Sequence, residues 1–323
     1  MEAVQADITA GPETPRRGLA ALRFWLRSQI WHRSVFMLPM LAMAYRRRFG
    51  QWPRLWQPRS FNEKLHLRMA LDRRPLLTQL AGKLESRAFV TQRLGRNDMQ
   101  PRLLAAIRHP DEVDGLDLPP RWIMKASHAS GCVRIVTEDD PIRPGEMRRL
   151  VAEWLPIEHG RYGLEWAYHN VKRVVVVEEL LSHQGDVPRD VKFFCFHGRV
   201  AYIQIDSDRF DGHQQSLFDT AWQRLDVQVK NYAPHTENVA PPQALSAMIR
   251  IAEQLSAGID FVRVDLYDLG ETVMVGELTN YPQGGSGNFN PPHWDDVFGG
   301  RWTLPSLPVL RGWARSPHVS GSR

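Results

Sequence analysis

The feature that most constrains the fold of this 323-residue chain is a pair of apolar runs that each carry one carboxylate. The stretch "FVRVDLYDLGETVMVGELTN", residues 261–280, reads as two strands around a polar turn, with Asp265 in the first and Glu277 in the second. Because side chains alternate along a strand, the register decides whether both acids face the same side. A two-residue loop at Leu269 and Gly270 would place them on opposite faces, whereas a loop of three or five residues would place them on one face.

Two carboxylates on one face of a hairpin lie about 5 to 8 Å apart and repel each other unless a cation lies between them. Mg²⁺ favours oxygen ligands, so a magnesium site is one interpretation of Asp265 and Glu277. The alternative is that one acid is solvated at a strand end and the other caps a loop. The hairpin alone does not separate these two interpretations, and the rest of the chain is needed.

The composition is that of a soluble globular protein with room for two or three domains, since 43% of the residues are hydrophobic and 24% are charged. The cysteines are Cys132 and Cys195, too few for a disulfide framework or a thiolate metal site. We therefore expect a reducing, cytoplasmic setting.

Positive charge is concentrated near the N-terminus. The net charge is +5, yet the first 60 residues hold ten arginines and three acids, and no acid lies between Glu13 and Glu63. Arginines alternate there with Trp, Phe, Leu and Met, which is typical of a segment at a membrane interface. Residues 16–55 are therefore a candidate contact with the anionic inner face of the cell membrane. The alternative is a basic helical hairpin packed on the main domain. The uncharged run 34–45 is too short to span a bilayer. Nucleic-acid binding is not expected, because the basic residues do not continue along the chain.

A helical region is expected to begin at Ser60, because Glu63 three residues later completes a capping box. The helical periodicity is broken near Pro75 and stops at Gly95. Strands then dominate, and they are expected in "RWIMKAS", "CVRIVT", "RVVVVEELL", "RDVKFFCF" and "RVAYIQIDSD".

The last two of these strands are expected to form a hairpin with a turn at His197 and Gly198. Further helices are expected at residues 145–155 and in "PPQALSAMIRIAEQL".

A small-residue loop in "MKASHASGCVRIV" follows a strand that carries Lys125. Ser127, Ser130 and Gly131 would let backbone N–H groups approach an anion closely, and the Lys125 ammonium beside them would neutralise phosphate charge. The loop is therefore a candidate phosphate site, although many such loops bind no phosphate.

Charged residues also lie in two apolar strands. Glu178 and Glu179 are consecutive at a strand end and must face opposite sides, so one of them points inward. An inward Glu suits a ribose hydroxyl or an adenine amino group, while the alternative is a salt bridge to a nearby Arg or Lys. Asp190 and Lys192 share a face of a strand otherwise rich in Phe, and such charges are costly unless they are matched.

The pattern formed by Asp206 and Asp208 indicates a different function, since many sugar-nucleotide transferases hold a metal with Asp-x-Asp. Three-residue patterns of this kind are common by chance. Arg209, which follows, is a candidate clamp for a transferring phosphoryl group or an acyl phosphate. A metal-dependent glycosyltransferase of polysaccharide biosynthesis is therefore the alternative function.

The order of the motifs resembles the TupA-like branch of the ATP-grasp superfamily, which is associated with teichuronopeptide, capsule and other bacterial surface polysaccharides. The resemblance covers about residues 59–302 and rests on "SFNEKL", "GKLESRAFV", "IMKASHASG", "VVVVEELL", "DVKFFCF", "DSDRF", "FVRVDLY" and "GELT" in matching order. It implies an α+β fold of the ATP-grasp type, in which ATP lies in a cleft between two α+β lobes. The implied organisation is a basic, aromatic-rich segment at 1–58, a catalytic region at 59–302 with a flap at about 120–180, and a tail at 303–323.

The resemblance also implies a binding site for ATP and Mg²⁺. The residues that would contact the nucleotide are Lys83, Lys125, Ser127, His128, Ser130, Gly131, Glu178, Glu179, Leu180, Asp190 and Lys192. Among them the lysines at 83 and 125 would contact phosphates, and Leu180 and the two acids before it would lie along the adenine and ribose. Lys192 and Arg209 would face the nucleotide or the acceptor as catalytic residues. The metal would be held by Asp265 and Glu277, with Thr279 or Asn280 as a neighbouring ligand.

The implied reaction is ATP-dependent ligation. A carboxylate attacks the γ-phosphate of ATP, and an amine or another nucleophile then displaces phosphate from the acyl phosphate. The substrates would be a carboxylate-bearing saccharide or amino acid and a polysaccharide precursor. Gly82 stands where the family usually has Asp, and Ala129 where it usually has Gly, so a non-catalytic nucleotide-binding scaffold is a third interpretation.

Overall fold

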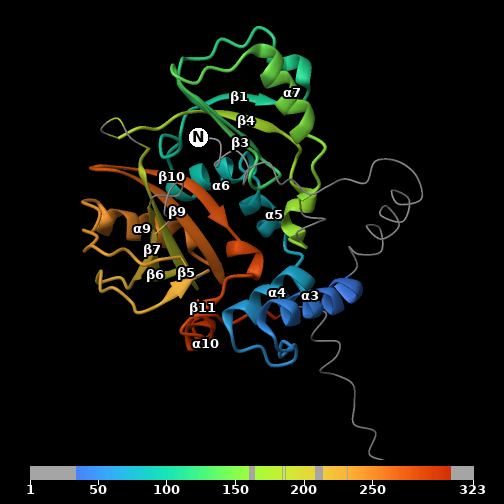
Figure 1. Cartoon of the computed structure of the whole chain (residues 1–323), viewed down its shortest axis with the longest axis vertical. Coiled ribbons are helices and arrows are strands. Elements are labelled where there is room, and N and C mark those ends of the chain that lie inside the picture. The colour runs from blue at the N-terminus through green and yellow to red at the C-terminus, as the bar shows by residue number, and fades with distance from the viewer. Residues whose placement is uncertain are drawn as a thin grey trace, which may run out of the picture.

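The computed structural model describes residues 34–159, 164–183, 185, 187–207, 214–230 and 232–306. Within these ranges the chain forms two lobes that are each built on an antiparallel sheet, with helices around them (Figure 1). The predicted mixture of helices and strands, an α+β fold, is confirmed.

Among the described residues, four helices precede the first strand, namely α3 (Ser34–Phe49), α4 (Phe61–Leu71), α5 (Pro75–Ala81) and α6 (Glu85–Leu94). The predicted capping box is present, because the Ser60 side chain accepts from the Glu63 backbone N–H while the Glu63 carboxylate accepts from the Ser60 backbone N–H. Gly95 ends α6 in the left-handed conformation with φ of 69°, which glycine adopts without the cost of a Cβ clash. The predicted helix boundaries at Ser60 and Gly95 are therefore confirmed.

The first lobe contains a four-stranded sheet in the order β1-β4-β2-β3. Its elements are β1 (Leu103–Ile107), η1 (Pro110–Val113), β2 (Trp122–Ala126), β3 (Val133–Val136), α7 (Pro144–Trp154) and β4 (Val175–Glu179). The short helix η2 (Trp166–Asn170), between α7 and β4, packs instead against α4 and α5. Buried side chains of α7, among them Met147 and Val151, form one core with Met124 and Val177 of the sheet. This sheet begins at Leu103, upstream of the expected start of the flap.

The second lobe contains a five-stranded sheet in the order β10-β9-β5-β6-β7. Its elements are β5 (Arg189–Phe196), β6 (Arg199–Ser207), β7 (Gln214–Phe218), β8 (Gln228–Val229), α9 (Leu245–Ser256), β9 (Phe261–Leu269), β10 (Thr272–Thr279), η3 (Pro282–Gly285), β11 (Phe289–Asn290) and α10 (His293–Gly300). The predicted turn between β5 and β6 is confirmed, since Phe196 pairs with Arg199 across His197 and Gly198.

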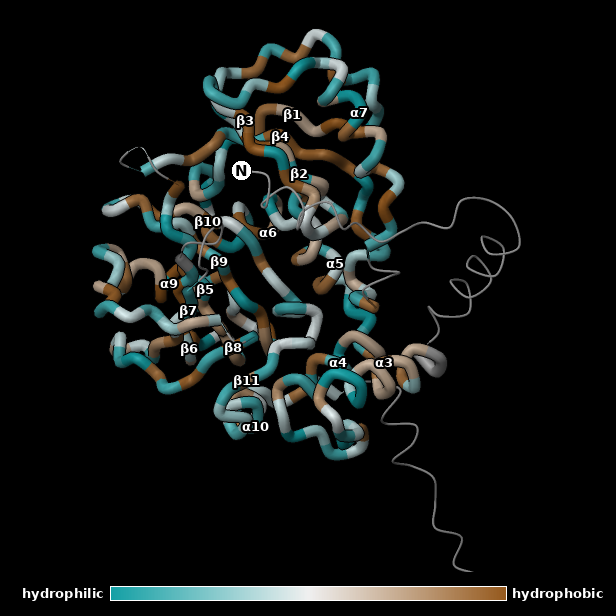
Figure 2. Tube along the Cα trace, in the orientation of Figure 1, coloured by the Kyte–Doolittle hydropathy of each residue, from teal (hydrophilic) through white to brown (hydrophobic). Residues whose placement is uncertain are grey.

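The two faces of the five-stranded sheet differ in character. On one face, Val262, Val264 and Leu266 of β9 pack with α9 in a continuous apolar core. On the other face, Phe261 packs on Phe61 of α4, with ring centroids 5.0 Å apart, but the residues that follow it on this face are polar. Brown and teal segments alternate in the five-stranded sheet in the hydropathy view (Figure 2). The sheet therefore has one apolar face and one face that carries polar residues.

Helix α3 lies against α4 (Figure 1). Its Met37, Leu41 and Tyr45 side chains are buried, and the Tyr45 ring lies 5.2 Å from the His66 ring of α4. The described part of the basic segment therefore packs on the main body on this face, while residues 16–33 lie outside the described residues. Among the helices of the described residues, none combines the length and the hydrophobicity that a membrane span needs.

Candidate active site

A cavity of about 820 Å³ lies between the two sheets. Its lining comes from β2, β3 and β4 on one side, from β5, β6, β9 and β10 on the other, and from α6 with the residues before it. Of the residues expected to form a site, those that line the cavity are Lys83, Lys125, Ser130, Gly131, Glu178, Asp190, Asp206, Asp265 and Glu277. Folding therefore gathers charged residues from distant parts of the sequence around one space.

Glu277 lies directly opposite Asp265 in the β9–β10 ladder. The turn is the two-residue loop Gly270 and Glu271, one position later than the loop considered from the sequence, since Leu269 pairs with Thr272. The expectation that one shared face requires a loop of three or five residues was wrong. The register shifts between Val275 and Glu277, so Gly276 is an extra residue in β10 that restores the shared face.

Arg263 lies on the same face of β9 as Asp265 and was not predicted from the sequence. Its guanidinium makes a two-pronged contact with Asp265, with Nε–Oδ1 and Nη2–Oδ2 both at 2.7 Å, and Nη2 also donates to Thr279 Oγ1 at 3.1 Å. The strand period could have revealed it, because residues i and i+2 share a face. Burial raises the pKa of Asp265, although Arg263 and Lys192 act in the opposite direction.

Lys192 pairs with Asp265 across β5 and β9, so Glu277, Asp265 and Lys192 form a row across three strands. The Lys192 ammonium contacts Asp190 Oδ2 at 2.5 Å and Asp206 Oδ2 at 3.1 Å. The charges of Asp190 and Lys192 on β5 thus compensate each other. Asp190 and Asp206 are two further acids beside the row formed by Glu277, Asp265 and Lys192.

Asp206 is held within this network rather than standing apart with a second acid. Its carboxylate accepts from Gln204 Nε2 at 2.9 Å and Gln215 Nε2 at 2.8 Å, in addition to the contact with Lys192. Asp208 and Arg209, the other residues singled out in this stretch, lie outside the described residues.

On the opposite wall, Glu178 lies between two cations. Lys125 Nζ is 3.0 Å from Glu178 Oε2, and Arg87 Nη1 is 2.8 Å from Oε1. Burial alone would lower the pKa of Lys125, but the Glu178 carboxylate holds this pKa above its usual value. Glu179 faces the other way and is exposed, 3.8 Å from Arg102. Leu180 follows the strand end and is half-buried.

Lys83 reaches the cavity beside the loop 127–131, where its ammonium donates to Ala129 O at 3.0 Å. Burial lowers the pKa of Lys83; Glu277 acts in the opposite direction, and Lys125 acts in the same direction as burial. The ammonium is therefore poorly solvated and only partly compensated, which is the condition under which a phosphate would bind it well.

The residues of the loop 127–131 have two different roles. Ser130 and Gly131 are exposed at the cavity, and Gly131 has φ of 80°. Ser127 is buried, with its Oγ accepting from Leu84 N–H at 3.0 Å. His128 Nε2 contacts Trp154 O at 3.1 Å, and burial lowers the pKa of its imidazole. Ser127 and His128 thus anchor the loop, while Ser130 and Gly131 face the space.

Gly82, which stands where the resembled family usually has Asp, has no room for a Cβ. A Cβ at this position would lie 2.1 Å from Glu85 Oε2 and 2.8 Å from Val171 Cγ1. Glu85 fills this space, accepting from Ser127 Oγ at 3.3 Å and from Lys172 N–H at 3.0 Å. A carboxylate therefore still lies beside the residue before Lys83, although it comes from α6.

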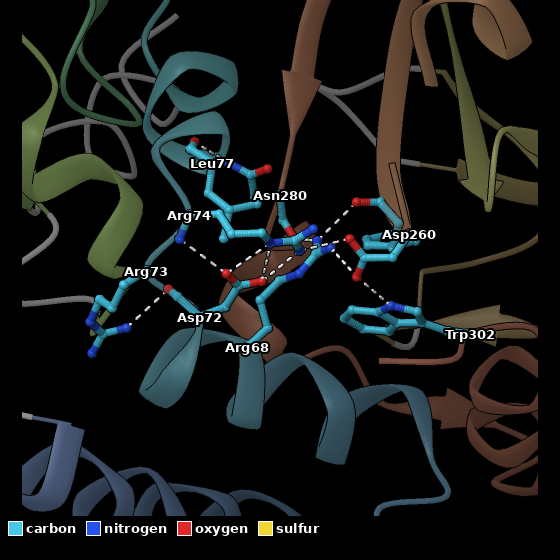
Figure 3. A network of polar contacts seen from close by, with 9 residues as sticks. Arg68, Asp72, Arg73, Arg74, Leu77, Asp260, Asn280 and Trp302 are labelled. Atoms are coloured by element: carbon cyan, nitrogen blue, oxygen red, sulfur yellow. Dashed lines mark hydrogen bonds and ion pairs between the residues drawn. The ribbon is translucent and has the colours of Figure 1, made fainter. Parts of the chain in front are cut away.

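Thr279 and Asn280 have different surroundings. Thr279 shares the face of Glu277 and contacts Arg263. The Asn280 amide donates to Leu77 O at 2.6 Å and belongs to a buried network around Arg68 and Asp260 that lies between α4, α5 and β9 (Figure 3). Thr279 and Asn280 are both absent from the cavity lining, whereas Asp265 and Glu277 belong to it.

Asp265 and Glu277 could provide two of the ligands of a Mg²⁺ ion, and the remaining ligands would have to come from elsewhere. Among the described residues no group of three or more His, Cys, Asp or Glu side chains is arranged to hold a metal ion. Mg²⁺ is commonly held by one or two carboxylates together with substrate phosphates. Each Asp265 oxygen retains a second lone pair beside its contact with Arg263, so Asp265 and Glu277 fit that arrangement.

Comparison with known proteins identifies the family. A family model described as TupA-like ATPgrasp matches residues 63–302. A search of curated proteins finds none that matches.

Several solved structures are similar to the chain. The D-alanine–D-alanine ligase of Bacillus anthracis is 16% identical with a TM-score of 0.36, covering 64% of this chain and 59% of its own. The L-amino acid ligase of Bacillus licheniformis is 14% identical with a TM-score of 0.44, covering 80% and 56%. The ATP-grasp ligase PsnB, solved with precursor peptide PsnA2 and AMPPNP, is 14% identical with a TM-score of 0.38, covering 79% and 64%.

The chain spans about three-fifths of the length of these ligases. The family match covers most of the sequence, and it includes the cavity residues on both sheets. The chain therefore belongs to the TupA-like ATP-grasp family.

Proposed function

We propose that this protein is a Mg²⁺- and ATP-dependent ligase that activates a carboxylate substrate as an acyl phosphate. The observation that carries the proposal is the meeting of Lys83 and Lys125 from one side with Asp265 and Glu277 from the other in a single cavity. A cavity of about 820 Å³ is within the range of small-molecule and cofactor sites. Two ammonium groups can bind phosphate oxygens, and two acids can hold the metal that accompanies them.

In the proposed reaction, a carboxylate oxygen of the substrate attacks the γ-phosphorus of ATP and ADP leaves. An amine, or another nucleophile, then attacks the acyl carbon and inorganic phosphate leaves, with loss of the proton from the nucleophile. Bound Mg²⁺ would neutralise part of the phosphate charge. Lys83 and Lys125 would hold the phosphates in line, and Arg263 would keep Asp265 oriented. Catalysis would rest mainly on positioning and charge neutralisation.

For the pathway, we propose the biosynthesis or modification of bacterial surface polysaccharide, with a carboxylate-bearing saccharide or amino acid as donor. This part of the proposal follows the association of the family with teichuronopeptide and capsule. Asp206 gives the glycosyltransferase alternative no support, because Lys192, Gln204 and Gln215 already occupy its carboxylate.

Thermal-shift titration and turnover test the proposal directly. We expect Mg-ATP to raise the Tm of the native protein, and the double variant Asp265→Asn with Glu277→Gln to lose the Mg²⁺-dependent part of that shift. Glu271→Gln, an exposed acid in the turn of the same hairpin, is the matched control and should behave as native. Mass analysis of reactions with ATP and candidate sugar acids would identify the product.

Three outcomes would contradict the proposal. The first is the absence of any stabilisation by Mg-ATP. The second is stabilisation by a UDP- or GDP-sugar with Mn²⁺ but not by ATP, which would indicate a glycosyltransferase. The third is ATP binding without turnover for any acceptor tested, which would indicate a nucleotide-binding scaffold.

A further inference from the structure

Helix α3 and the loop after it carry exposed tryptophan, methionine and arginine side chains that the fold does not bury. Met43 is 48% exposed on the side of α3 away from α4, next to the exposed Arg46 and Arg47. Trp52 is 56% exposed and Trp56 is 70% exposed in the loop that follows. We call these five residues the tryptophan–arginine patch.

The patch is unusual for this chain. The described residues contain six large exposed hydrophobic side chains, and three of them, including both tryptophans, belong to the patch. The other three are valines. Tryptophan is mostly buried in soluble proteins, so two exposed tryptophans four residues apart mark an interaction surface.

A cation–π contact connects the loop to the helix. The Arg46 guanidinium carbon lies 4.6 Å from the centre of the Trp52 ring. Arg46 and Arg47 lie in the last turn of α3, where Arg48 is also exposed. The patch therefore presents aromatic rings and positive charge together rather than in separate regions.

Arg54, which lies between Trp52 and Trp56 in the sequence, is paired with two acids. Glu63 is buried and bound by Arg54 at 2.9 Å, and the same arginine reaches Asp296 at 3.2 Å. The sequence contains no acid between Glu13 and Glu63. Positive charge on this surface is therefore not matched by acids of the neighbouring sequence, and it favours an anionic partner.

We infer that the tryptophan–arginine patch binds the surface of an anionic phospholipid bilayer, with Trp52 and Trp56 at the level of the headgroups. Tryptophan rings favour this level because they are apolar with one polar N–H, and arginines nearby are attracted to anionic lipids. Helices α3 and α4 lie at the end of the molecule away from the four-stranded sheet (Figure 1). A bilayer at this end would leave the four-stranded sheet away from the lipid (Figure 1).

Vesicle flotation of the full-length protein tests this inference, which is independent of the proposed ligase activity. The probes are phosphatidylcholine vesicles with about 30% phosphatidylglycerol, compared with pure phosphatidylcholine, in low salt. We expect binding to the anionic vesicles only, with release in about 0.5 M NaCl, where charges are screened within a few ångströms. The double variants Arg46→Glu with Arg47→Glu, and Trp52→Ala with Trp56→Ala, should each lower the partition coefficient about tenfold or more.

Two matched controls accompany these variants. Arg121→Glu with Arg143→Glu makes the same charge change at exposed positions of the four-stranded lobe, and Val297→Ala shortens an exposed apolar side chain on α10. Both should bind vesicles as the native protein does. An unchanged Tm in every variant would show that the fold is retained.

The inference is overturned by any of three results. The native protein remains with the unbound fraction in low salt; it binds neutral and anionic vesicles equally; or both patch variants float as well as native, so that other basic segments account for the binding.

Discussion

Glu277 lies opposite Asp265 because Gly276 is an extra residue in β10. The two-residue turn would otherwise pair Asp265 with position 276, and the bulge moves the pairing on by one residue. Gly276 also lines the cavity, and a Cβ there would lie 3.0 Å from a Tyr267 ring carbon and 3.3 Å from Asp265 O. The bulge thus leaves little room for a Cβ where β10 passes the cavity.

We predict that Gly276→Val weakens Mg-ATP binding about tenfold. The valine would press on Tyr267 and displace Glu277 from its place opposite Asp265, and overpacking of this kind also costs about 1 to 3 kcal/mol of stability. Titration of ATP at several Mg²⁺ concentrations would measure the effect. Thr272→Val, exposed at the start of the same strand, should leave binding unchanged. Native affinity in Gly276→Val would show that the bulge has no part in metal or nucleotide binding.

The two consecutive acids at the end of β4 are predicted to differ in their contribution to stability. Glu178 is buried and bound by Arg87 and Lys125, so Glu178→Gln should lower the free energy of unfolding by about 2 kcal/mol, because two half-buried cations lose their shared partner. Glu179 is half exposed and 3.8 Å from Arg102, so Glu179→Gln should leave the free energy of unfolding unchanged. Urea unfolding would compare the two variants, and equal losses would contradict this assignment.

Much of the fold was predictable because its signals are local. The capping box at Ser60, the left-handed Gly95 and the turn at His197 and Gly198 each depend on a few adjacent residues. The strand β1 was not predicted, since "LLAAI" has one β-branched residue and no alternation, and only its pairing with β4 makes it a strand.

The arrangement of the site was less predictable, because it depends on pairings between distant strands. Lys192 lies opposite Asp265 through the β5–β9 ladder, and Arg87 meets Glu178 across more than ninety residues of sequence. Neither contact leaves a pattern in the sequence. Arg263 could have been predicted from its position two residues before Asp265, whereas the bulge at Gly276 had only the weak signal of a glycine within a strand.

The lowered pKa of Lys83 predicts that ATP binding takes up protons in mildly alkaline solution. Burial lowers the pKa of this ammonium in the free protein, and nearby phosphates would raise it again. Calorimetric titration at about pH 9, below the ordinary lysine pKa of about 10.4, in two buffers with different ionisation enthalpies, would measure the uptake.

Two lysine variants separate Lys83 from its neighbour. Lys83→Arg should abolish proton uptake, because arginine does not titrate in this range. Lys125→Arg should retain it, because the pKa of Lys125 is raised and its ammonium is already charged. Native uptake in Lys83→Arg would contradict the assignment.

The buried network around Asp260 predicts a specific loss of stability in acid. Asp260 is bound by Arg68 and Arg74, each at 2.7 Å, and by the Trp302 indole N–H at 2.9 Å (Figure 3). Burial alone would raise the pKa of Asp260, but these donors hold it below its usual value. The stabilisation is therefore present above the unfolded-state pKa of about 3.9 and is lost as the pH falls through the lower folded-state pKa.

Arg68→Met removes one partner of this buried network and should cost about 3 to 5 kcal/mol at neutral pH, because the Asp260 charge is left in part uncompensated. Arg68 also donates to Phe261 O at 2.9 Å, at the start of β9, so the loss should extend to the strand that carries Asp265. The difference in unfolding free energy between native and Arg68→Met should shrink as the pH falls below about 4, because Asp260 is protonated in the variant at a higher pH than in the native protein, where Arg68 holds its pKa down. Urea unfolding at pH 7 and at about pH 3 would measure it. Arg96→Met, which removes the exposed pair with Asp98, is the control and should leave the Tm unchanged, and a pH-independent loss in Arg68→Met would show that packing rather than charge accounts for its effect.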